Sequence, residues 1–546
     1  MALRFWFLTG CIIAAFAAIV LRLYQLQFTK GGYYSARAES QYLASSAVTA
    51  NRGLIYFTDR KGSRLPAALN ERFPIIYAVP KAIDDAAEAA NVLGPILTRP
   101  VADLEKIFSK KSDTYELLQR KADPALARQV EDLNIKGIYV DMLPGRFYPL
   151  GSLASHLIGF AGPSKDSAAN TGHYGVEEFY DAKLNGGFGA NTQKGTNPDP
   201  QTDLILTIDP NIQTEAEKVL QNLIADQHAD GGTVIVADPQ TGKILAMESW
   251  PGFDPNSYAS SSIASFLNPA TQQVYEPGSV FKVLTMAIGI DARKLTPETT
   301  YFDKGTVTLN GRTISNYDLK THGPYGTVTM TNVIEHSINT GAVHAERLVG
   351  RTIFTDYLHR FGFSEKTGVD LPGEVTGNLK RLNPKERDIA FATASYGQGV
   401  AVTPLELISA IAAIANGGNL MRPYVNADLA PSIIRRVISA ETAEKVTGMM
   451  VSAVDKASVA SISGYSIAGK TGTAFIPDFV HGGYSDRVIT SYVGFGPTKD
   501  PKFIILLKLN DLPSTALAAT NVVPAFRELA QFVLNYYNIQ PDRINP

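Results

Sequence analysis

The chain has 546 residues, of which 45% are apolar and 19% charged, and this length favours two or three globular domains over a single compact core. The formal net charge of −2 gives no indication of a nucleic-acid partner, and the single cysteine excludes an intrachain disulfide. The eight histidines show no metal-ligand spacing, so we expect no metal and no cofactor.

The N-terminus carries an apolar segment. Phe5 to Leu21 is free of charged residues and lies between Arg4 and Arg22, and as a helix it extends for roughly 25 Å, enough for the hydrocarbon core of a membrane. The alternative is a cleaved signal peptide, because Ala15-Phe16-Ala17 has the small-x-small form. Bulky residues follow the segment, so we predict an uncleaved transmembrane anchor over residues 1–27, whose orientation the flanking charges leave open.

Residues 28–200 have mixed and irregular patterning. Strand-like pieces such as Phe73–Val79 alternate with helical stretches such as Asp84–Val92. The segment Gly186–Thr202 is rich in glycine, asparagine and proline and has almost no apolar residues, which is typical of a linker. We therefore expect a separate N-terminal domain that ends near residue 200.

From residue 201 the patterns become regular. Leu204–Ile208 is strand-like, and Asp209 followed by Pro210 is typical of a helix start. Two pairs of apolar β-like runs predict hairpins at residues 233–247 and 488–509. The apolar helical windows are Val280–Ile290, Val333–Leu348, Leu405–Ala415 and Val523–Tyr536. This order predicts an α/β fold of the α+β type, a central antiparallel sheet covered by helices.

A serine and a lysine lie three positions apart, at Ser279 and Lys282. Pro277-Gly278 interrupts the chain before an apolar helical stretch, so we expect Ser279 at a helix N-terminus with Lys282 on the same face. Burial among apolar neighbours favours a neutral lysine, which can take the serine proton. The backbone N–H of Ser279 is a candidate oxyanion donor. A serine and a lysine at this spacing also occur by chance in a long chain, so the pair alone does not identify a catalytic site.

Ser337-Ile338-Asn339 forms a second, weaker motif. Serine and asparagine at this spacing usually satisfy local backbone groups in helices and turns. As part of a site, Ser337 could pass a proton to a leaving amine and Asn339 could orient a substrate amide.

Lys470-Thr471-Gly472-Thr473 is more specific and lies in a strand-like context. Gly472 removes a side chain where another backbone could approach, so a substrate strand could pair along this edge. The Lys470 cation and the hydroxyls of Thr471 and Thr473 suit a substrate carboxylate. Gly464–Thr471 also matches a phosphate-binding loop, but strand-like residues lead into it, and Pro477 disfavours the helix that such a loop needs.

The motifs S-x-x-K, S-x-N and K-T-G in this order are those of a serine acyl-transfer site. On them the chain resembles the penicillin-binding proteins, and more narrowly the monofunctional class B transpeptidases. Further stretches that resemble family motifs are Arg52–Gly62, with an insertion between Ile55 and Asp59, Arg146–Phe160, Gly175–Tyr180 and Ser395–Leu405. The resemblance therefore covers nearly the whole chain.

This resemblance implies a penicillin-binding transpeptidase domain over residues 201–546 and an elongated pedestal or dimerisation domain over residues 28–200. It implies a single-pass protein of the bacterial cytoplasmic membrane whose catalytic domain is extracytoplasmic. The D-Ala-D-Ala end of a peptidoglycan stem peptide would acylate Ser279, and a second stem's amine would then form the cross-link. β-Lactam antibiotics would mimic the substrate and trap Ser279.

The resemblance also implies roles for the other motif residues. Lys282 would be the base, and Ser337, Asn339 and Lys470 would complete the proton network. The terminal carboxylate would bind at Lys470 and at the stretch Thr471, Gly472 and Thr473, with the Thr473 N–H as second oxyanion donor.

Several alternatives stay open. Glu276 before Pro-Gly-Ser and the stretch Ser395–Gly399 resemble the division type more than the elongation type. The implied partner is a polytopic membrane glycosyltransferase of the shape, elongation, division and sporulation family. A D,D-carboxypeptidase shares all three motifs, and a β-lactamase is disfavoured by the N-terminal motifs. A β-lactam sensor or a non-catalytic division scaffold is the alternative of another class, and the intact Ser279, Lys282 and Lys470 argue against the scaffold.

Overall fold

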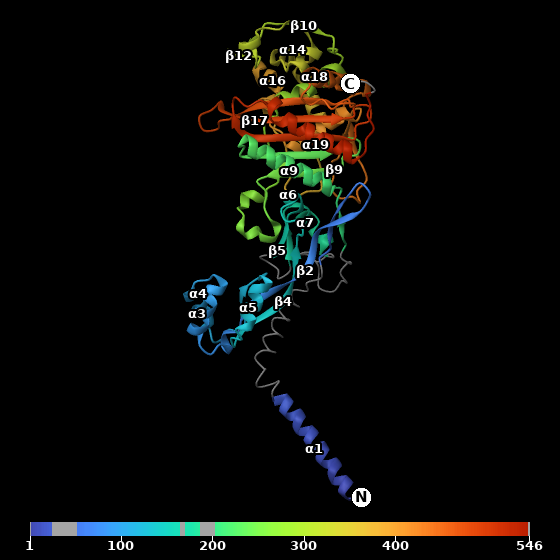
Figure 1. The fold of residues 1–546 in the computed structure, drawn as a ribbon. Helices are drawn as coiled ribbons and strands as arrows, with labels where there is room; N and C mark the ends of the chain where they lie inside the picture. The colour runs from blue at the N-terminus through green and yellow to red at the C-terminus, as the bar shows by residue number, and fades with distance from the viewer. Residues whose placement is uncertain (1, 25–51, 164–169, 186–201, 544–546) are drawn as a thin grey trace.

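The computed structural model describes residues 2–24, 52–163, 170–185 and 202–543 (Figure 1). Helix α1 (Ala2–Tyr24) covers the apolar N-terminal segment. Within the described ranges, no helix has both the length and the apolar character that crossing a membrane requires. The transmembrane anchor thus stays a prediction. Both expected domain boundaries, and all but the last residue of the expected linker, lie outside the described residues.

Four strands of the N-terminal region form a five-stranded sheet of order β3-β2-β1-β7, in which β4 also pairs with β2, and β7 comes from the start of the region predicted as the catalytic domain. The strand predicted at Phe73–Val79 is confirmed as the end of β2, and the helix at Asp84–Val92 as the start of α3. Helices α3 to α5 pack at one end of β2 and β4, over a small apolar core (Figure 1). The elements are β1 (Ile55–Thr58), β2 (Arg64–Ala78), α3 (Ala86–Leu97), α4 (Val101–Phe108), β3 (Glu116–Gln119), α5 (Pro124–Asp132), β4 (Ile138–Phe147), α6 (Ser155–Ile158), β5 (Phe160–Pro163), β6 (Asn170–His173), α7 (Gly175–Phe179), α8 (Asp181–Leu184) and β7 (Leu204–Ile205).

Three of the N-terminal motifs meet in one buried ion cluster. Glu177 on α7 is fully buried, with its Oε2 2.6 Å from Nε of Arg52 and its Oε1 2.7 Å from Nε of Arg146. Burial raises the pKa of Glu177, but the two guanidinium groups outweigh it and bring the pKa below its ordinary value. The cluster therefore ties together three segments that lie far apart in the sequence.

Replacing this shared carboxylate should destabilise the protein strongly. In Glu177→Gln the buried Arg146 loses the carboxylate that it pairs with, whereas Arg52 keeps its ion pair with Asp181. Breaking a buried pair in this way costs about 3–5 kcal/mol. The folded-state pKa of Glu177 lies below the unfolded value of 4.5, so its contribution is present above that pH and is lost as the pH falls through the folded pKa. Urea unfolding should show a large loss at neutral pH that shrinks below pH 4.5. The exposed substitution Glu131→Gln is the control, and an equal loss in both variants would contradict the prediction.

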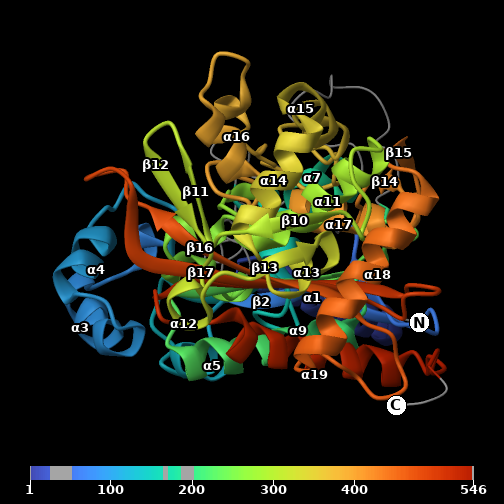
Figure 2. The same ribbon diagram turned by 90° about the horizontal axis from the view of Figure 1, so that it is seen from above.

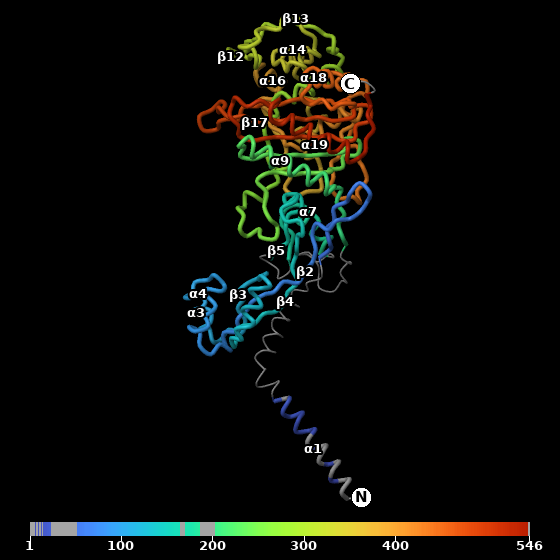
Figure 3. Tube along the Cα trace, in the orientation of Figure 1, coloured from blue at the N-terminus to red at the C-terminus, as the bar shows by residue number. Residues whose placement is uncertain are grey.

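The larger domain contains a five-stranded antiparallel sheet of order β16-β17-β18-β8-β9. In Figure 3 the hairpin of residues 231–250 lies beside the strands of residues 468–513, and β8 pairs with β18. Both predicted hairpins and the antiparallel sheet are confirmed. The strands are β8 (Gly231–Ala237), β9 (Ile244–Trp250), β16 (Ala468–Pro477), β17 (Tyr484–Gly496) and β18 (Phe503–Pro513).

Helices cover both faces of this sheet (Figure 2). α9 (Pro210–Gln227) and α19 (Val522–Tyr536) pack on one face, and α11 (Lys282–Asp291), α17 (Pro404–Ala415) and α18 (Ala440–Ala457) pack on the other. α9 begins as predicted, because the Asp209 carboxylate accepts hydrogen bonds from the N–H groups of its first turn. The prediction of a sheet covered by helices is confirmed.

Shorter elements form the end of the molecule away from α1 (Figure 1). The single helix predicted at Val333–Leu348 is wrong, because α13 ends at Glu335 and α14 begins only at Asn339. Ser337 between them has a left-handed φ of 57°, which interrupts the helix. These and the remaining elements are α10 (Pro269–Gln272), β10 (Thr300–Asp303), β11 (Thr306–Leu309), β12 (Arg312–Ser315), α12 (Leu319–His322), β13 (Gly326–Thr329), α13 (Met330–Glu335), α14 (Asn339–Val349), α15 (Arg351–Arg360), α16 (Asp388–Ala394), β14 (Asn419–Met421) and β15 (Ile433–Arg436).

Candidate active site

The turn that carries Ser279 lies between two other segments. A 3₁₀ turn (Gly278–Phe281) leads directly into α11, so Ser279 lies at a helix N-terminus as predicted. Gly278 has a φ of 58°, and a Cβ there would lie 2.6 Å from the carbonyl oxygen of Thr473 on β16. On its other side, the N–H of Gly278 donates to the carbonyl oxygen of Gly397 at 3.1 Å. The absent side chain lets the turn, β16 and the Ser395–Gly399 stretch meet beside Ser279.

Lys282 is completely buried at the start of α11. Its Nζ donates to the backbone carbonyl of Ser337 and lies 3.2 Å from the Ser337 Oγ. Burial, reinforced by the charge of Lys470, lowers the pKa of Lys282 well below its ordinary value, and the carboxylate of Asp318 opposes this. A neutral amine in the first turn after Ser279 is suited to accept a proton.

The Ser337 hydroxyl lies between two lysine amines. Nζ of Lys470, which comes from β16, is 2.9 Å from the Ser337 Oγ, and Nζ of Lys282 is 3.2 Å from the same atom. Burial lowers the pKa of Lys470 to about 7. Two ammonium groups this close repel each other, which favours a neutral form of at least one of them. The hydroxyl can therefore pass a proton between the amines.

Strand β16 carries Lys470–Thr473 at the edge of the sheet. Thr471 pairs with Tyr492 and Thr473 with Thr490, both on β17. Among the described strands no other pairs with β16, so its outer edge is available to an extended peptide. Gly472 faces the turn that carries Ser279, since a Cβ there would lie 2.8 Å from the carbonyl oxygen of Pro277. The close backbone approach predicted at this glycine is thus made by the protein's own chain.

Asn339 is the first residue of α14. Its Nδ2 donates to the carbonyl oxygen of Ser315 at 2.9 Å, and this bond fixes the orientation of the amide. The amide oxygen accepts no hydrogen bond from any residue in the described ranges, so it is left for a ligand N–H.

Comparison with known protein families covers most of the chain. The family model described as penicillin binding protein transpeptidase domain matches residues 232–531, and that described as penicillin-binding protein dimerisation domain matches residues 47–199. The chain belongs to the penicillin-binding protein family. The resemblance to class B members noted in the sequence motifs is thereby confirmed.

Relatives of this penicillin-binding protein align along nearly its full length. Stage V sporulation protein D of Bacillus subtilis is 31% identical, with 94% of this chain and 82% of the relative covered. Peptidoglycan D,D-transpeptidase FtsI of Escherichia coli is 29% identical, with 99% and 93% covered. Probable peptidoglycan D,D-transpeptidase PenA of Neisseria meningitidis is 26% identical, with 99% and 94% covered.

The penicillin-binding protein has a supporting residue that the sequence motifs did not single out. Asp303 is fully buried and accepts hydrogen bonds from Thr340 Oγ1 at 2.5 Å and from Asn316 Nδ2 and the Tyr325 N–H, both at 3.0 Å. Thr340 follows Asn339 directly, so this network holds the start of α14 and the turn at Ser337. Its members are spread from position 303 to position 340, and no short motif could have revealed them.

Asp303→Asn should therefore slow acylation and also lower the stability of the fold. An amide of the same size cannot accept all of these hydrogen bonds, and each buried donor left unpaired costs about 1–3 kcal/mol. We expect a lower melting temperature together with slower labelling by a fluorescent penicillin. Asp356→Asn, an exposed change on α15, should alter neither measurement. An unchanged labelling rate in Asp303→Asn would show that the network does not support the site.

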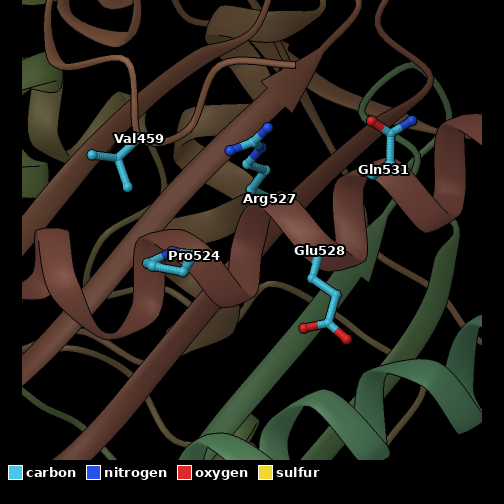
Figure 4. Close-up of a pocket in the computed structure, with 5 residues that line it drawn as sticks. All are labelled: Val459, Pro524, Arg527, Glu528 and Gln531. Carbon is cyan, nitrogen blue, oxygen red and sulfur yellow. The ribbon is translucent and has the colours of Figure 1, made fainter. Parts of the chain in front are cut away.

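A surface hollow of about 460 Å³ lies away from these residues. It is lined by Val459, Pro524, Arg527, Glu528 and Gln531 (Figure 4). Most of this lining comes from α19, which covers the face of the sheet opposite to α11. None of the predicted site residues lines the hollow.

Proposed function

We propose that this penicillin-binding protein is a serine-type peptidoglycan D,D-transpeptidase that acts in septal cell-wall synthesis. Relatives named as peptidoglycan D,D-transpeptidases align with 99% of the chain, and the FtsI and PenA names support this activity. The observation that carries the proposal is the Ser337 hydroxyl, 3.2 Å from the buried Nζ of Lys282 and 2.9 Å from that of Lys470.

Acylation begins with proton transfer from the Ser279 hydroxyl to the neutral amine of Lys282. The Ser279 oxygen attacks the carbonyl carbon of the penultimate D-Ala, and the backbone N–H groups of Ser279 and Thr473 stabilise the oxyanion. The peptide C–N bond then breaks, and the terminal D-Ala leaves with a proton supplied through Ser337 and Lys470. An ester on Ser279 results.

Substrate binding and the second step use the same residues. Lys470, Thr471 and Thr473 hold the terminal carboxylate, Gly472 keeps the strand close to the turn, and Asn339 accepts from a backbone amide of the donor stem. The amine of a second stem then attacks the ester, forms the cross-linking amide and returns the proton to Ser279. A β-lactam acylates Ser279 in the same way as the substrate. Its leaving nitrogen stays attached to the acyl group, so the acyl-enzyme persists.

Product analysis separates the transpeptidase from a D,D-carboxypeptidase. A synthetic stem pentapeptide donor and an amine acceptor should give a cross-linked product together with free D-Ala, measured by mass spectrometry. Release of D-Ala with water as the sole acceptor would favour the carboxypeptidase instead. Rapid turnover of penicillin would favour a β-lactamase, and acylation by penicillin without any reaction of the stem peptide would favour the sensor.

Membrane attachment and a partner belong to the same proposal. The uncharged segment Phe5–Leu21 supports an anchor within residues 1–27, followed by a pedestal over 28–200 and the catalytic domain over 201–546 outside the cytoplasmic membrane. The partner is a polytopic glycosyltransferase that supplies new glycan. A fluorescent fusion should collect at midcell in dividing cells, and side-wall signal alone would favour the elongation type. Recovery of the fusion in the soluble fraction would contradict the anchor.

A further inference from the structure

A row of polar side chains crosses the apolar core behind the K-T-G strand. From Gly472 on β16, directly paired positions run through Ser491 on β17, Lys508 on β18 and Thr233 on β8 to Ser249 on β9. Directly paired residues lie on the same face of a sheet. These four side chains are all buried on the face of the sheet that packs against α11.

Lys508 is the unusual member of this row. It is 3% exposed, and no carboxylate in the described ranges forms an ion pair with it. Its Nζ lies 2.5 Å from Oδ1 of Asn510 and 4.8 Å from the centre of the Tyr275 ring. Burial lowers the pKa of Lys508 to about 8. The Asn510 oxygen and the face of the Tyr275 ring are the surroundings that suit an ammonium group. Burying a cation without a countercharge costs free energy.

Tyr275 connects Lys508 to the nucleophile turn. The backbone N–H of Tyr275 and its carbonyl both bond to Val402 at 2.9 Å, and the chain then runs directly into Glu276 and the turn of Ser279. The Tyr275 ring is buried, and a cation over a buried aromatic face is a directional contact. Lys508 therefore restrains the segment from which the nucleophile projects.

Ser491 connects Tyr275 and Lys508 to the K-T-G strand. Its Oγ occupies the space that a side chain on Gly472 would need. Burial raises the pKa of the Tyr275 phenol and the adjacent Ser491 hydroxyl opposes this, although no hydrogen bond of regular geometry joins the two groups. Tyr275 thus lies close both to Lys508 and to Ser491, the residue that faces Gly472.

We propose that Lys508 is a positioning residue for acyl transfer, a buried cation that holds Tyr275 against Ser491 and so keeps the turn of Ser279 in place on strand β16. The inference rests on the proposed acyl-transfer function and adds to it a residue outside the three motifs. Lys508 does not touch the substrate. It acts because the serine, its base and the oxyanion donors come from two separate segments, and a displacement of about 1 Å between such segments can slow a reaction roughly 100-fold.

The test measures the acylation rate constant separately from the affinity of the non-covalent complex. Stopped-flow mixing of the full-length protein with a fluorescent penicillin gives both values. Lys508→Met keeps the length and volume of the side chain and removes the charge. We expect an acylation rate constant about tenfold lower, an unchanged dissociation constant and a melting temperature at or above that of the wild type. Lys499→Met, at an exposed lysine before the same strand, should match the wild type in all three.

Variants of Tyr275 test whether the cation acts through the ring. Tyr275→Leu should slow acylation, and Tyr275→Phe, which keeps the ring, should slow it less. Because both residues belong to one contact, the double variant Lys508→Met with Tyr275→Leu should be no slower than the worse single variant. Additive losses would overturn the proposal, as would a wild-type rate constant in Lys508→Met. A variant in which a smaller fraction of the protein is labelled, but at the wild-type rate constant, would indicate a purely structural role. That result would also overturn the proposal.

These outcomes are distinct from failure of the proposed function. If the wild-type protein is not labelled, or is labelled at a residue other than Ser279, the acyl-transfer mechanism fails and this proposal with it. If the wild type is labelled at Ser279 and Lys508→Met is labelled equally fast, only the role of Lys508 is lost.

Discussion

Ser279→Ala should abolish covalent labelling by a fluorescent penicillin and all cross-linking of stem peptides. Without the hydroxyl no ester can form, so we expect a loss of at least about 1,000-fold in either assay. Ser279 is only partly buried and lies in a turn whose course depends on Gly278, so the fold should be unaffected. Labelling is read on a denaturing gel, and the modified peptide is located by mass spectrometry.

The control for this variant is Ser262→Ala, at an exposed serine in the loop before α10. It should be labelled as fast as the wild type, and the melting temperatures of all three proteins should agree within error. Labelling of Ser279→Ala at the wild-type rate would contradict the assignment of Ser279 as the nucleophile. It would also remove the basis for the roles of Lys282, Ser337 and Lys470.

Lys282→Met should leave Ser279 in place and remove its base. General base catalysis typically contributes 100- to 10,000-fold, and we expect the acylation rate constant to fall by about that factor. In the wild type the rate should decline as the pH falls through the pKa of Lys282, because a protonated amine cannot accept the serine proton. Burial and the neighbouring Lys470 hold this pKa well below that of a free lysine, so the decline lies on the acid side of its usual range.

Lys294→Met is the matched control, because this lysine lies just beyond the same helix and is exposed. The pH profile of acylation should lose its acid limb in Lys282→Met and keep it in Lys294→Met. A Lys282→Met protein with the wild-type rate and profile would mean that another group, such as Lys470, takes the proton. That result would move the base from α11 to strand β16.

Local sequence spacing was sufficient for part of this protein. Ser279 and Lys282 share a helical face because residues three apart in a helix always do, and Pro277-Gly278 ends the preceding segment. Apolar β-like runs predicted the hairpins around residues 233–247 and 488–509, and the structure confirms them. These features depend on backbone periodicity and turn chemistry, which a short stretch of sequence carries completely.

Other features depend on which distant segments of the chain pack together. A helix was expected through Ser337, but the chain leaves the helix there, and the Ser337 carbonyl accepts from Lys282 across 55 positions. The Arg52–Glu177 and Arg146–Glu177 pairs span 125 and 31 positions. The sequence shows these residues but not which of them pair, because any of several charged groups could have been the partner.

The sequence by itself determined the chemical types and the order of the reactive groups, the apolar patterns that make a helix-covered sheet, and the helix start beneath Ser279. Only the tertiary structure decided that Ser337 lies between two amines, that Gly472 makes room for the turn of Ser279, and that Lys508 lies against the ring of Tyr275. The reason is physical. Periodicity is a property of neighbouring residues, whereas burial, and with it the lowered pKa values of Lys282 and Lys470, is produced by segments that meet only when the whole domain has folded.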